Sequence, residues 1–361
     1  MEDNKKIKVL VIDDSSMFRR IIAKYLQEHP ELEVVATAKD PYDARDKIIE
    51  FRPDVLTLDI EMPGMNGIEF LKIIMNQCPI PTIVISGVDG RCFEAISAGA
   101  VGFVEKPSSS TMNEFSNDLA SKIKEASVAK LDKKKYAKTN SSQVNKSVQR
   151  KSTFNSENIR RRNDKDIIAI GASMGGVEAV AKVISQLPLG LPPIVITQHM
   201  PPVFTKRYAE RLNKECVINV LEGKDGQELL SGHAYIAPGG LQMGIAKKNN
   251  KYVLEIKGGE KVSGHCPSVD YLFQSVAKVA KENVIGVILT GMGSDGAKGL
   301  LDIKEAHGYT IGQNKHSCVV YGMPMAAKNL GAVEKESSLE MIPNVILNQL
   351  KRRQSTVKSK D

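Results

Sequence analysis

Residues 7–28 read IKVLVIDDSSMFRRIIAKYLQE and contain one complete strand-and-helix unit. Ile7 to Ile12 is a β-branched run that ends at two aspartates, whereas Met17 to Glu28 carries its apolar side chains at helical spacing. The alternation continues to residue 128, with predicted strands at Leu32–Thr37, Val55–Leu58, Thr82–Ile85 and Gly102–Val104 and predicted helices at Tyr42–Phe51, Ile68–Met75, Phe93–Ala98 and Met112–Val128. We therefore predict that residues 5–128 form an α/β domain of the (βα)5 type, with helices on both faces of a parallel sheet.

The same rhythm returns in the second half of the chain. Predicted strands at Ile167–Ile170, Ile194–Thr197 and Val284–Leu289 alternate with helical segments, and the runs Leu241–Lys247 and Tyr252–Lys257 around Asn249-Asn250 indicate a hairpin. Residues 165–350 are therefore expected to form a doubly wound α/β domain with a mostly parallel sheet and a β-hairpin insertion. The polar tail 351–361 is expected to be disordered.

The composition is that of a folded, water-soluble protein. Its 361 residues suffice for two domains at about 100–200 residues each, and 42% apolar with 25% charged residues argue against wholesale disorder or a coiled coil. No stretch reaches the roughly 18 apolar residues of a membrane span, so a cytoplasmic location without membrane insertion is expected. The five cysteines are an odd number without a C-x-x-C pair, which favours neither a disulfide framework nor a zinc site.

The formal net charge of +8 comes from one segment. Residues 130–165 contain 12 Lys or Arg and 3 Asp or Glu, a net of +9, which leaves 38 basic and 39 acidic residues elsewhere, a net of −1. With few apolar residues to bury, residues 129–164 are interpreted as a flexible basic linker. A tether that contacts an acidic partner is the alternative, and a nucleic-acid arm is disfavoured because aromatic residues for base stacking are scarce.

Polar side chains follow the strands of the first predicted domain. Asp13 and Asp14 follow the first strand, Asp59 the third, Ser86 the fourth and Lys106 the fifth. Ligands of parallel α/β sheets bind at the carboxyl ends of the strands, so these groups are expected to converge on one pocket. Three carboxylates close together repel one another unless a cation neutralises them, and oxygen ligands favour Mg²⁺. The hydroxyl of Ser86 and the ammonium of Lys106 are suited to bind a phosphoryl group.

These motifs resemble the receiver domain of bacterial two-component response regulators, which is flavodoxin-like. The matching stretches are V-L-V-I-D-D-S at 9–15, L-T-L-D-I-E-M-P-G-M-N-G at 56–67 and G-A-V-G-F-V-E-K-P at 99–107. The resemblance implies that Asp59 accepts the phosphoryl group and that Ser86 and Lys106 bind its oxygens. It also implies that Asp13, Asp14, Asp59 and the carbonyl of Glu61 bind Mg²⁺. Phe103 is either the switch aromatic or simple core packing.

Three turns of the second domain carry candidate catalytic groups. Gly171-Ala172-Ser173-Met174-Gly175 has the G-x-S-x-G spacing that exposes a serine on a tight strand-to-helix turn, although the same letters also suit a phosphate cradle or a packing turn. His199 directly follows a strand and is the best-placed candidate base among six histidines, and His265 lies in a Gly-flanked loop that is suited to line the substrate. Asp295 follows another strand and is interpreted either as the orienting carboxylate or as a helix N-cap.

The second domain resembles the catalytic domain of the chemotaxis protein-glutamate methylesterases, the CheB family. The matching stretches are I-G-A-S-M-G-G at 170–176, Q-H-M-P-P-V-F-T-K-R-Y-A-E-R-L at 198–212, Y-I-A-P-G-G at 235–240, P-S-V-D-Y-L-F at 267–273, I-L-T-G-M-G-S-D-G-A-K-G-L at 288–300 and V-V-Y-G-M-P-M-A-A at 319–327. The resemblance implies that Ser173 is the nucleophile, His199 the general base and acid, Asp295 the orienting carboxylate and the Met292 amide an oxyanion donor.

The resemblance also implies an activity and its control. A phosphorylation-activated serine hydrolase would remove glutamate γ-methyl esters from the cytoplasmic helices of chemoreceptors, release methanol and deamidate receptor glutamines. The receiver would obstruct the hydrolase until a chemotaxis histidine kinase donates a phosphoryl group. Mg²⁺ is expected in the receiver, no cofactor in the hydrolase, no nucleic acid as partner, and a monomer.

Three features depart from the family pattern. Met174 replaces the usual threonine beside the nucleophile, and Gln242 stands where a histidine is expected after A-P-G-G. The segment from Ser86 to Lys106 is shorter than usual, so the surface that rearranges on phosphorylation is expected to differ. No candidate member of the triad is missing.

Two other classes of function compete with this interpretation. A non-catalytic output module that binds nucleic acid would need a reader such as a helix-turn-helix, yet the sequence after residue 165 is α/β and nearly neutral. A nucleotide-binding turn at 171–176 would need G-x-G-x-x-G, which is missing there.

Overall fold

The computed structural model describes residues 5–87, 91–107, 112–131 and 165–358. The chain divides into two compact units, Met1–Ser147 and Val148–Asp361. Residues 132–164, most of the predicted linker, lie outside the described residues. None of the helices in the described part of the chain combines the length and hydropathy that a membrane span requires.

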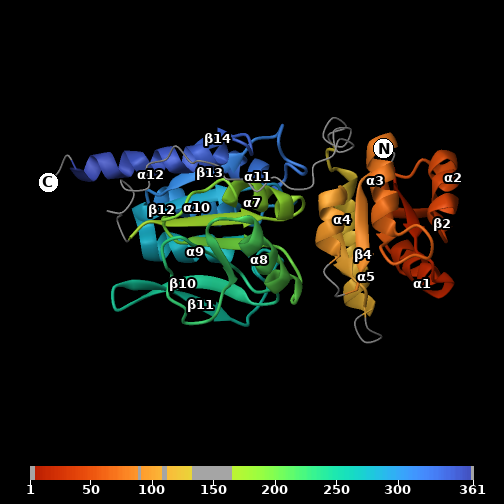
Figure 1. Cartoon of the computed structure of the whole chain (residues 1–361), viewed down its shortest axis with the longest axis horizontal. Coiled ribbons are helices and arrows are strands. Elements are labelled where there is room, and N and C mark those ends of the chain that lie inside the picture. Colours follow the sequence, from red (N-terminus) through yellow and green to blue (C-terminus); the bar gives the residue numbers. More distant parts are fainter. Residues whose placement is uncertain (1–4, 88–90, 108–111, 132–164, 359–361) are drawn as a thin grey trace. The chain divides into compact units, whose positions relative to one another are not determined.

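The first unit is a five-stranded parallel sheet in the order β2-β1-β3-β4-β5, with helices on both faces (Figure 1), which confirms the predicted (βα)5 fold. Its strands are β1 (Ile7–Ile12), β2 (Leu32–Ala38), β3 (Val55–Asp59), β4 (Thr82–Ser86) and β5 (Gly102–Glu105). Its helices are α1 (Ser16–Gln27), α2 (Pro41–Phe51), α3 (Gly67–Gln77), α4 (Cys92–Ala98) and α5 (Met112–Ser127).

Side-chain caps fix the start of three helices of this unit. The side chains of Ser15, Asp40 and Asn66 accept hydrogen bonds from the first-turn amides of α1, α2 and α3. Close approach is needed at Gly67, where a Cβ would lie 2.0 Å from the carbonyl oxygen of Asp59. The connection after β3 therefore folds back so that the start of α3 lies against the end of the strand.

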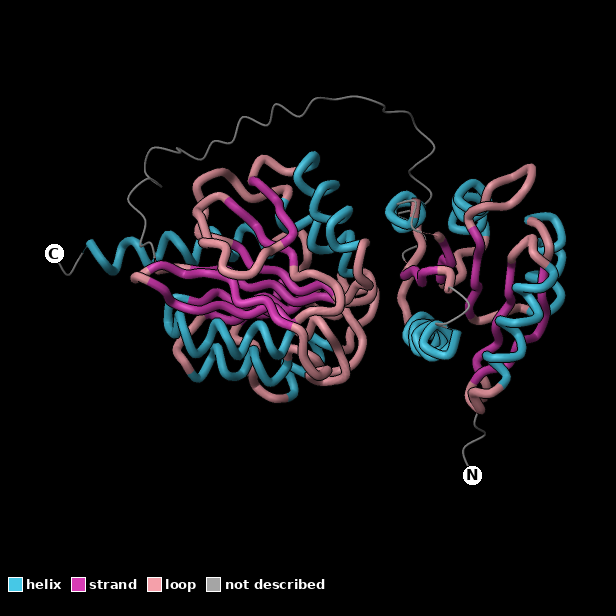
Figure 2. Tube along the Cα trace, turned by 90° about the horizontal axis from the view of Figure 1, so that it is seen from below, coloured by secondary structure: helices cyan, strands magenta, loops and turns pink. Residues whose placement is uncertain are grey.

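The second unit contains a seven-stranded sheet in the order β14-β13-β12-β6-β7-β9-β8, in which every neighbouring pair is parallel. Figure 2 shows helices on both faces of this sheet, as predicted for a doubly wound domain. The strands are β6 (Ile167–Ala172), β7 (Ile194–Gln198), β8 (Asn219–Glu222), β9 (His233–Ile236), β12 (Val284–Ile288), β13 (Tyr309–Gln313) and β14 (Lys335–Ser337). The helices are α7 (Gly176–Ile184), α8 (Phe204–Glu215), α9 (Val269–Ala280), η2 (Lys281–Asn283), α10 (Ala297–Glu305), α11 (Met323–Asn329) and α12 (Ile342–Lys358).

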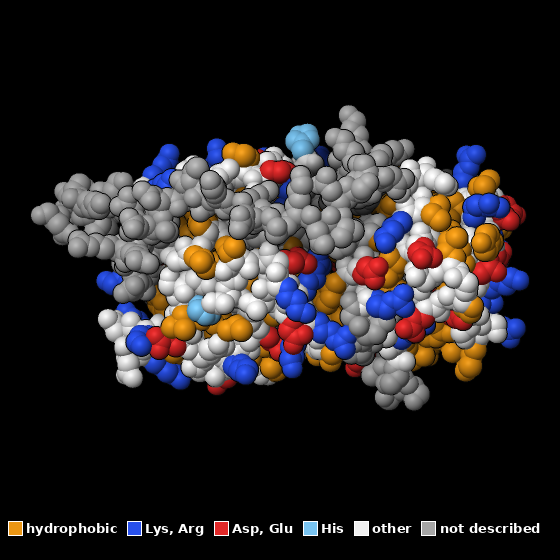
Figure 3. Space-filling view, in the orientation of Figure 1, with side chains coloured by type: hydrophobic (Ala, Val, Ile, Leu, Met, Phe, Trp, Pro, Cys, Tyr) orange, Lys and Arg blue, Asp and Glu red, His pale blue; other side chains and the backbone are white. Residues whose placement is uncertain are grey.

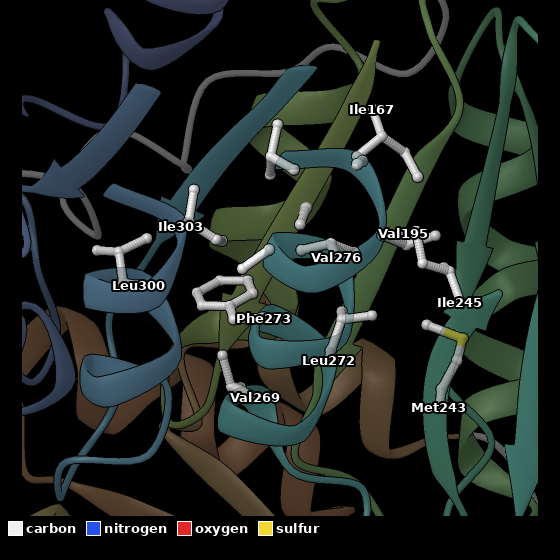
Figure 4. Close-up of a cluster of buried hydrophobic side chains, with 14 of the residues drawn as sticks. Ile167, Val195, Met243, Ile245, Val269, Leu272, Phe273, Val276, Leu300 and Ile303 are labelled. Atoms are coloured by element: carbon white, nitrogen blue, oxygen red, sulfur yellow. The ribbon is translucent and has the colours of Figure 1, made fainter. Parts of the chain in front are cut away.

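The predicted hairpin forms a separate two-stranded sheet of β10 (Gln242–Lys248) and β11 (Lys251–Lys257). Asn249 and Asn250 both have positive φ, at 49° and 64°, as a two-residue hairpin turn requires. Figure 4 shows α9 between the hairpin and the main sheet, with Leu272 and Phe273 among the buried side chains of the core. Burial of each such side chain stabilises the fold by about 1.5–3 kcal/mol.

The prediction of a disordered tail from residue 351 was wrong for most of its length. Helix α12 continues to Lys358, and residues 359–361 lie outside the described residues. The first part of this helix is held by buried apolar residues that recur every four positions, Ile342, Ile346 and Leu350. Beyond them, the helix is held by hydrogen bonds of Arg353. Arg353 Nη1 donates to Asp166 Oδ1 at 2.8 Å and Nη2 donates to the carbonyl of Val284 at 3.0 Å. The polar composition of this segment does not indicate a helix, because the partners of Arg353 are remote from it in the sequence.

Candidate functional site

Three neighbouring strands of the larger sheet carry the candidate catalytic groups. Ser173 directly follows β6, His199 directly follows β7, and Asp295 lies in the turn that joins β12 to α10. In the sheet, β6 is hydrogen-bonded to β12 on one side and to β7 on the other. The three turns therefore leave the same edge of the sheet at adjacent positions.

The side chains of these residues form a continuous hydrogen-bonded chain. His199 Nδ1 lies 3.0 Å from Ser173 Oγ, and His199 Nε2 lies 2.7 Å from Asp295 Oδ2. An ionised carboxylate only accepts hydrogen bonds, so Nε2 carries the proton and Nδ1 is left to accept from the serine hydroxyl. This arrangement lets His199 take a proton from Ser173 as the hydroxyl attacks a substrate.

Asp295 is held by the N-terminus of α9. Its Oδ1 accepts from Ser268 Oγ at 2.8 Å and from the Asp270 amide at 2.9 Å, and its Oδ2 accepts from the Val269 amide at 2.8 Å. Burial acts to raise the pKa of Asp295, but the hydrogen bonds from His199 and from these amides outweigh burial and lower the pKa. The carboxylate therefore stays ionised beside His199.

The turn after β6 places Ser173 against its neighbours at close range. Gly175 has a φ of 73°, and a Cβ on Gly176 would lie 2.1 Å from Gln198 Oε1. The Gln198 carboxamide donates to the carbonyls of Ser173 at 2.9 Å and His199 at 3.2 Å, and so ties the two turns together. Sequence reasoning missed Gln198, although its place directly before His199 was a usable signal.

The Met292 amide remains a proposed oxyanion donor. The amide of Ser173 donates to the carbonyl of Thr290 at 3.0 Å, so it is already engaged. A Cβ on Gly291 would lie 2.8 Å from Ser173 Cβ, which places the backbone just before Met292 against the serine. The Met292 side chain is 36% exposed.

A second histidine lies against the first. The rings of His199 and His265 are stacked, with centroids 3.8 Å apart and planes 9° apart. His265 Nδ1 donates to the carbonyl of Ser263 at 2.9 Å. Burial, followed by the nearby His199, lowers the pKa of His265, so this ring stays neutral near pH 7.

The cluster of His199, His265 and Asp295 has the residue types of a metal site, and its ligand atoms lie within 4.8 Å of one another. A metal binds imidazole nitrogen in the plane of the ring, and two parallel stacked rings cannot both point their lone pairs at one ion between them. Both nitrogens of His199 already face Ser173 and Asp295. The geometry fits proton transfer better than metal binding.

The first unit gathers its predicted acidic pocket at the carboxyl edge of its sheet. Asp13, Asp59 and Ser86 are each 1% exposed, whereas Asp14 is exposed. Lys106 Nζ lies 2.7 Å from Asp59 Oδ2 and 3.6 Å from Asp13 Oδ2. The carboxylate oxygens of Asp13, Asp14 and Asp59 lie within 4.8 Å of one another. The pocket thus holds three carboxylates, and one ammonium group lies beside two of them.

The charge balance of this pocket fits a bound cation. Burial, then the nearby Asp59, raises the pKa of Asp13 to about 6. Among the described residues, none donates a hydrogen bond to the buried Asp13 Oδ2. A buried acceptor without a donor, beside two further carboxylates, is the environment that a hard cation such as Mg²⁺ neutralises.

The other predicted receiver residues lie around the same edge. The Glu61 amide donates to Asp59 Oδ1 at 3.2 Å, so the backbone of Glu61 runs beside the candidate phosphoacceptor. Ser86 ends β4, and Lys106 follows β5, the neighbouring strand. Phe103 is 6% exposed and packs edge-on against Phe93 with ring centroids 6.1 Å apart. This packing is compatible with both interpretations of Phe103.

Comparisons with known proteins agree across the chain. A family model described as CheB methylesterase matches residues 168–346, and one described as response regulator receiver domain matches residues 9–114. Protein-glutamate methylesterase/protein-glutamine glutaminase 2 of Syntrophomonas wolfei is 45% identical over 356 residues, which cover 96% of this chain and 99% of the relative. The chain belongs to the CheB methylesterase family.

Further relatives extend this result. The protein-glutamate methylesterase/protein-glutamine glutaminase of Salmonella typhimurium is 43% identical over 352 residues, covering 96% of this chain and 97% of the relative. The crystal structure of the Thermotoga maritima CheB methylesterase catalytic domain matches with a TM-score of 0.50 at 37% identity, over 51% of this chain and 98% of that one. As a CheB family member, the chain joins a receiver domain to a methylesterase domain.

The departures from the family pattern lie at or near the two sites. The Met174 side chain is 6% exposed, and the carbonyl of Met174 accepts from Thr290 Oγ1 at 3.0 Å, so a neighbouring strand end supports this turn. Gln242 is buried and hydrogen-bonded to the loop before α9. In the short segment between β4 and β5, residues 88–90 lie outside the described residues. Ser268, which sequence reasoning missed, is the N-cap of α9 and also donates to Asp295.

Proposed function

We propose that this CheB family member is a protein-glutamate methylesterase and protein-glutamine glutaminase whose triad is Ser173, His199 and Asp295. The hydrogen-bonded chain from Ser173 Oγ through the His199 ring to Asp295 carries the proposal. The substrates are glutamate γ-methyl esters and glutamines on the cytoplasmic helices of chemoreceptors, which places the reaction in the cytoplasm.

Hydrolysis begins with the serine. Ser173 Oγ attacks the ester carbonyl while its proton passes to His199 Nδ1, and Asp295 stabilises the resulting imidazolium. The negative charge on the carbonyl oxygen is stabilised by backbone amides, of which the Met292 amide is the proposed donor. His199 then returns the proton to the leaving oxygen, and methanol departs from the acyl-enzyme.

Water completes the cycle. His199 takes a proton from the water that attacks the acyl-enzyme, and then returns that proton to Ser173 Oγ as the glutamate carboxyl group is released. A glutamine side chain follows the same route, except that ammonia leaves in the first half. One triad therefore serves both the esterase and the glutaminase reaction.

The receiver domain supplies the control. Asp59 is proposed to accept a phosphoryl group from a histidine kinase, with Ser86 and Lys106 binding its oxygens. Asp13, Asp14, Asp59 and the Glu61 carbonyl would hold Mg²⁺, which when bound neutralises charge on the phosphoryl oxygens. A coupling of about 1–3 kcal/mol between the domains would change hydrolysis by about 5- to 150-fold.

The face of the molecule seen in Figure 3 does not favour nucleic-acid binding. Lys, Arg, Asp and Glu side chains are interspersed on the face seen in Figure 3, rather than gathered into a basic stripe.

Methanol release from methylated chemoreceptor membranes tests the proposed function. The purified full chain should release methanol, and acetyl phosphate with Mg²⁺ should increase the rate. Mass spectrometry of the receptors should find glutamate where the sequence encodes glutamine. If the chain releases no methanol under either condition, the proposed activity is wrong.

A further inference from the structure

Gln242 is a buried side chain that links the hairpin to the hydrolytic site. It is the first residue of β10 and is 2% exposed. Its Oε1 accepts from the Ser268 amide at 2.9 Å, and its Nε2 donates to the carbonyls of His265 at 3.0 Å and Glu260 at 3.1 Å. Both amide hydrogens and the amide oxygen are therefore in use, which fixes the orientation of the carboxamide.

The segment that Gln242 holds, residues 265–268, contacts two members of the proposed triad. At one end, the His265 ring stacks on the His199 ring. At the other end, Ser268 Oγ donates to Asp295 Oδ1 at 2.8 Å. Gln242 bonds to the backbone at both of these ends, so a shift of the segment would move the ring and the hydroxyl together.

The hairpin does not need Gln242 for its attachment to the domain. The Ile245 amide donates to Ser275 Oγ on α9 at 2.7 Å, and the same hydroxyl donates to the Ile245 carbonyl at 3.1 Å. Met243, Ile245 and Leu254 of the hairpin belong to the buried core. The bonds of Gln242 point instead to the loop that lies against the triad.

We propose that Gln242 is a positioning residue for hydrolysis, which locks residues 265–268 so that His265 supports the His199 ring and Ser268 supports Asp295. The inference rests on the proposed triad. Gln242 does not touch the substrate in this role. Its effect is on the rate of the chemical step, because small displacements of catalytic groups slow that step far more than they weaken substrate binding.

The test compares Gln242→Met with Gln242→His. Methionine keeps the length of the side chain and removes all three hydrogen bonds, whereas a neutral imidazole keeps one donor and one acceptor. In the full chain with methylated receptor membranes, we expect Gln242→Met to lower kcat by about 10- to 100-fold with KM changed less than about 2-fold. Gln242→His should recover most of the loss.

Two measurements separate positioning from general damage. The rate at which a fluorophosphonate labels Ser173 should fall in parallel with kcat, and the downfield proton signal of the His199–Asp295 hydrogen bond should weaken or shift. Thr310→Val is the matched control, because Thr310 is also buried and its replacement removes two hydrogen bonds, with Ala332 and Glu334, at the amino end of β13 and away from the triad. It should keep wild-type kcat and the wild-type proton signal.

The outcomes distinguish this inference from the proposed function. If Gln242→Met keeps kcat within about 2-fold of wild type, or loses no more than Thr310→Val, the positioning role is wrong. If Gln242→Met does not stay folded, Gln242→Glu, which keeps the acceptor for Ser268, takes its place with the same readouts. A Ser173→Ala variant that still releases methanol would instead overturn the triad itself.

Discussion

His199 Nε2 lies 2.7 Å from Asp295 Oδ2, although the two residues are 96 positions apart in the chain. The carboxylate of Asp295 also accepts hydrogen bonds from donors at the N-terminus of α9, which hold it in place beside His199. The partial positive charge of a helix N-terminus favours an anion at this place. The orientation of the His199 ring is thus fixed by a carboxylate that is itself held in place.

Replacement of Ser173 by alanine should abolish hydrolysis without disturbing the receiver. We expect methanol release to fall by about 10⁴- to 10⁶-fold, because the proposed nucleophile is lost and only the remaining site can assist water. Phosphorylation by acetyl phosphate, followed on Phos-tag gels, should be unchanged. Loss of both properties would point to misfolding rather than to a nucleophile at residue 173.

Replacement of Asp295 by asparagine should lower kcat by about 10⁴-fold, because the amide favours the wrong tautomer of His199. Stability should also fall, by about 1–3 kcal/mol, since an amide NH₂ then faces buried donors. Methanol assays and urea unfolding measure the two effects. Asp302→Asn on α10, outside the site, is the control and should leave both values unchanged. Near-normal turnover in Asp295→Asn would exclude this carboxylate from the triad.

Replacement of Asp59 by asparagine should leave basal hydrolysis intact and remove the response to phosphodonor. Wild type should be stimulated by acetyl phosphate and Mg²⁺ by about 5- to 150-fold if the coupling is of ordinary size. Asp54→Asn, a conservative change at the other end of β3, should retain the stimulation. A normal response in Asp59→Asn would contradict control through this residue.

Stability should depend on pH through His265. Its folded pKa is lowered below the ordinary 6.5, so the unfolded chain binds the proton more readily than the folded chain does. This contribution is fully present above pH 6.5 and is lost as the pH falls toward the lower folded pKa. His265→Phe keeps a stacking ring but cannot titrate, and should therefore lose less stability than wild type between pH 7.5 and 5.5.

Calorimetry of the full chain at the two pH values measures this difference. The exposed His316 provides the control, because His316→Phe should reproduce the wild-type dependence on pH. A His265→Phe profile that matches wild type would show that this ring does not titrate as its surroundings indicate.

Replacement of Arg353 by alanine should destabilise the second unit by about 1–3 kcal/mol, because the buried Asp166 and the carbonyl of Val284 each lose the hydrogen bond that Arg353 donates. Lys182→Ala removes the exposed ion pair with Glu340 and should cost less than about 1 kcal/mol. Urea unfolding measures both. Equal effects would mean that the Arg353 anchor does not hold α12 in solution.

The sequence by itself determined the two α/β folds and the edges at which the sites lie. Short β-branched and apolar runs that end at Asp13, Asp59, Ser173 or His199 locate strand ends, and parallel strands bring their carboxyl ends to one edge. The resemblance of the motifs to receivers and methylesterases then assigned roles to these positions. All of this information is local, since each motif is a strand and the turn that follows it.

Only the tertiary structure decided which groups support the site. The position of Asp295 in the sequence also suits a cap of its own helix, yet α10 begins at Ala297 without a side-chain cap and Asp295 instead binds the N-terminus of α9. The stacking of His265 on His199 and the three bonds of Gln242 likewise join segments that are remote in sequence. Such contacts leave no periodic signal, because they depend on where the loops end in space and not on the local preferences of the residues that make them.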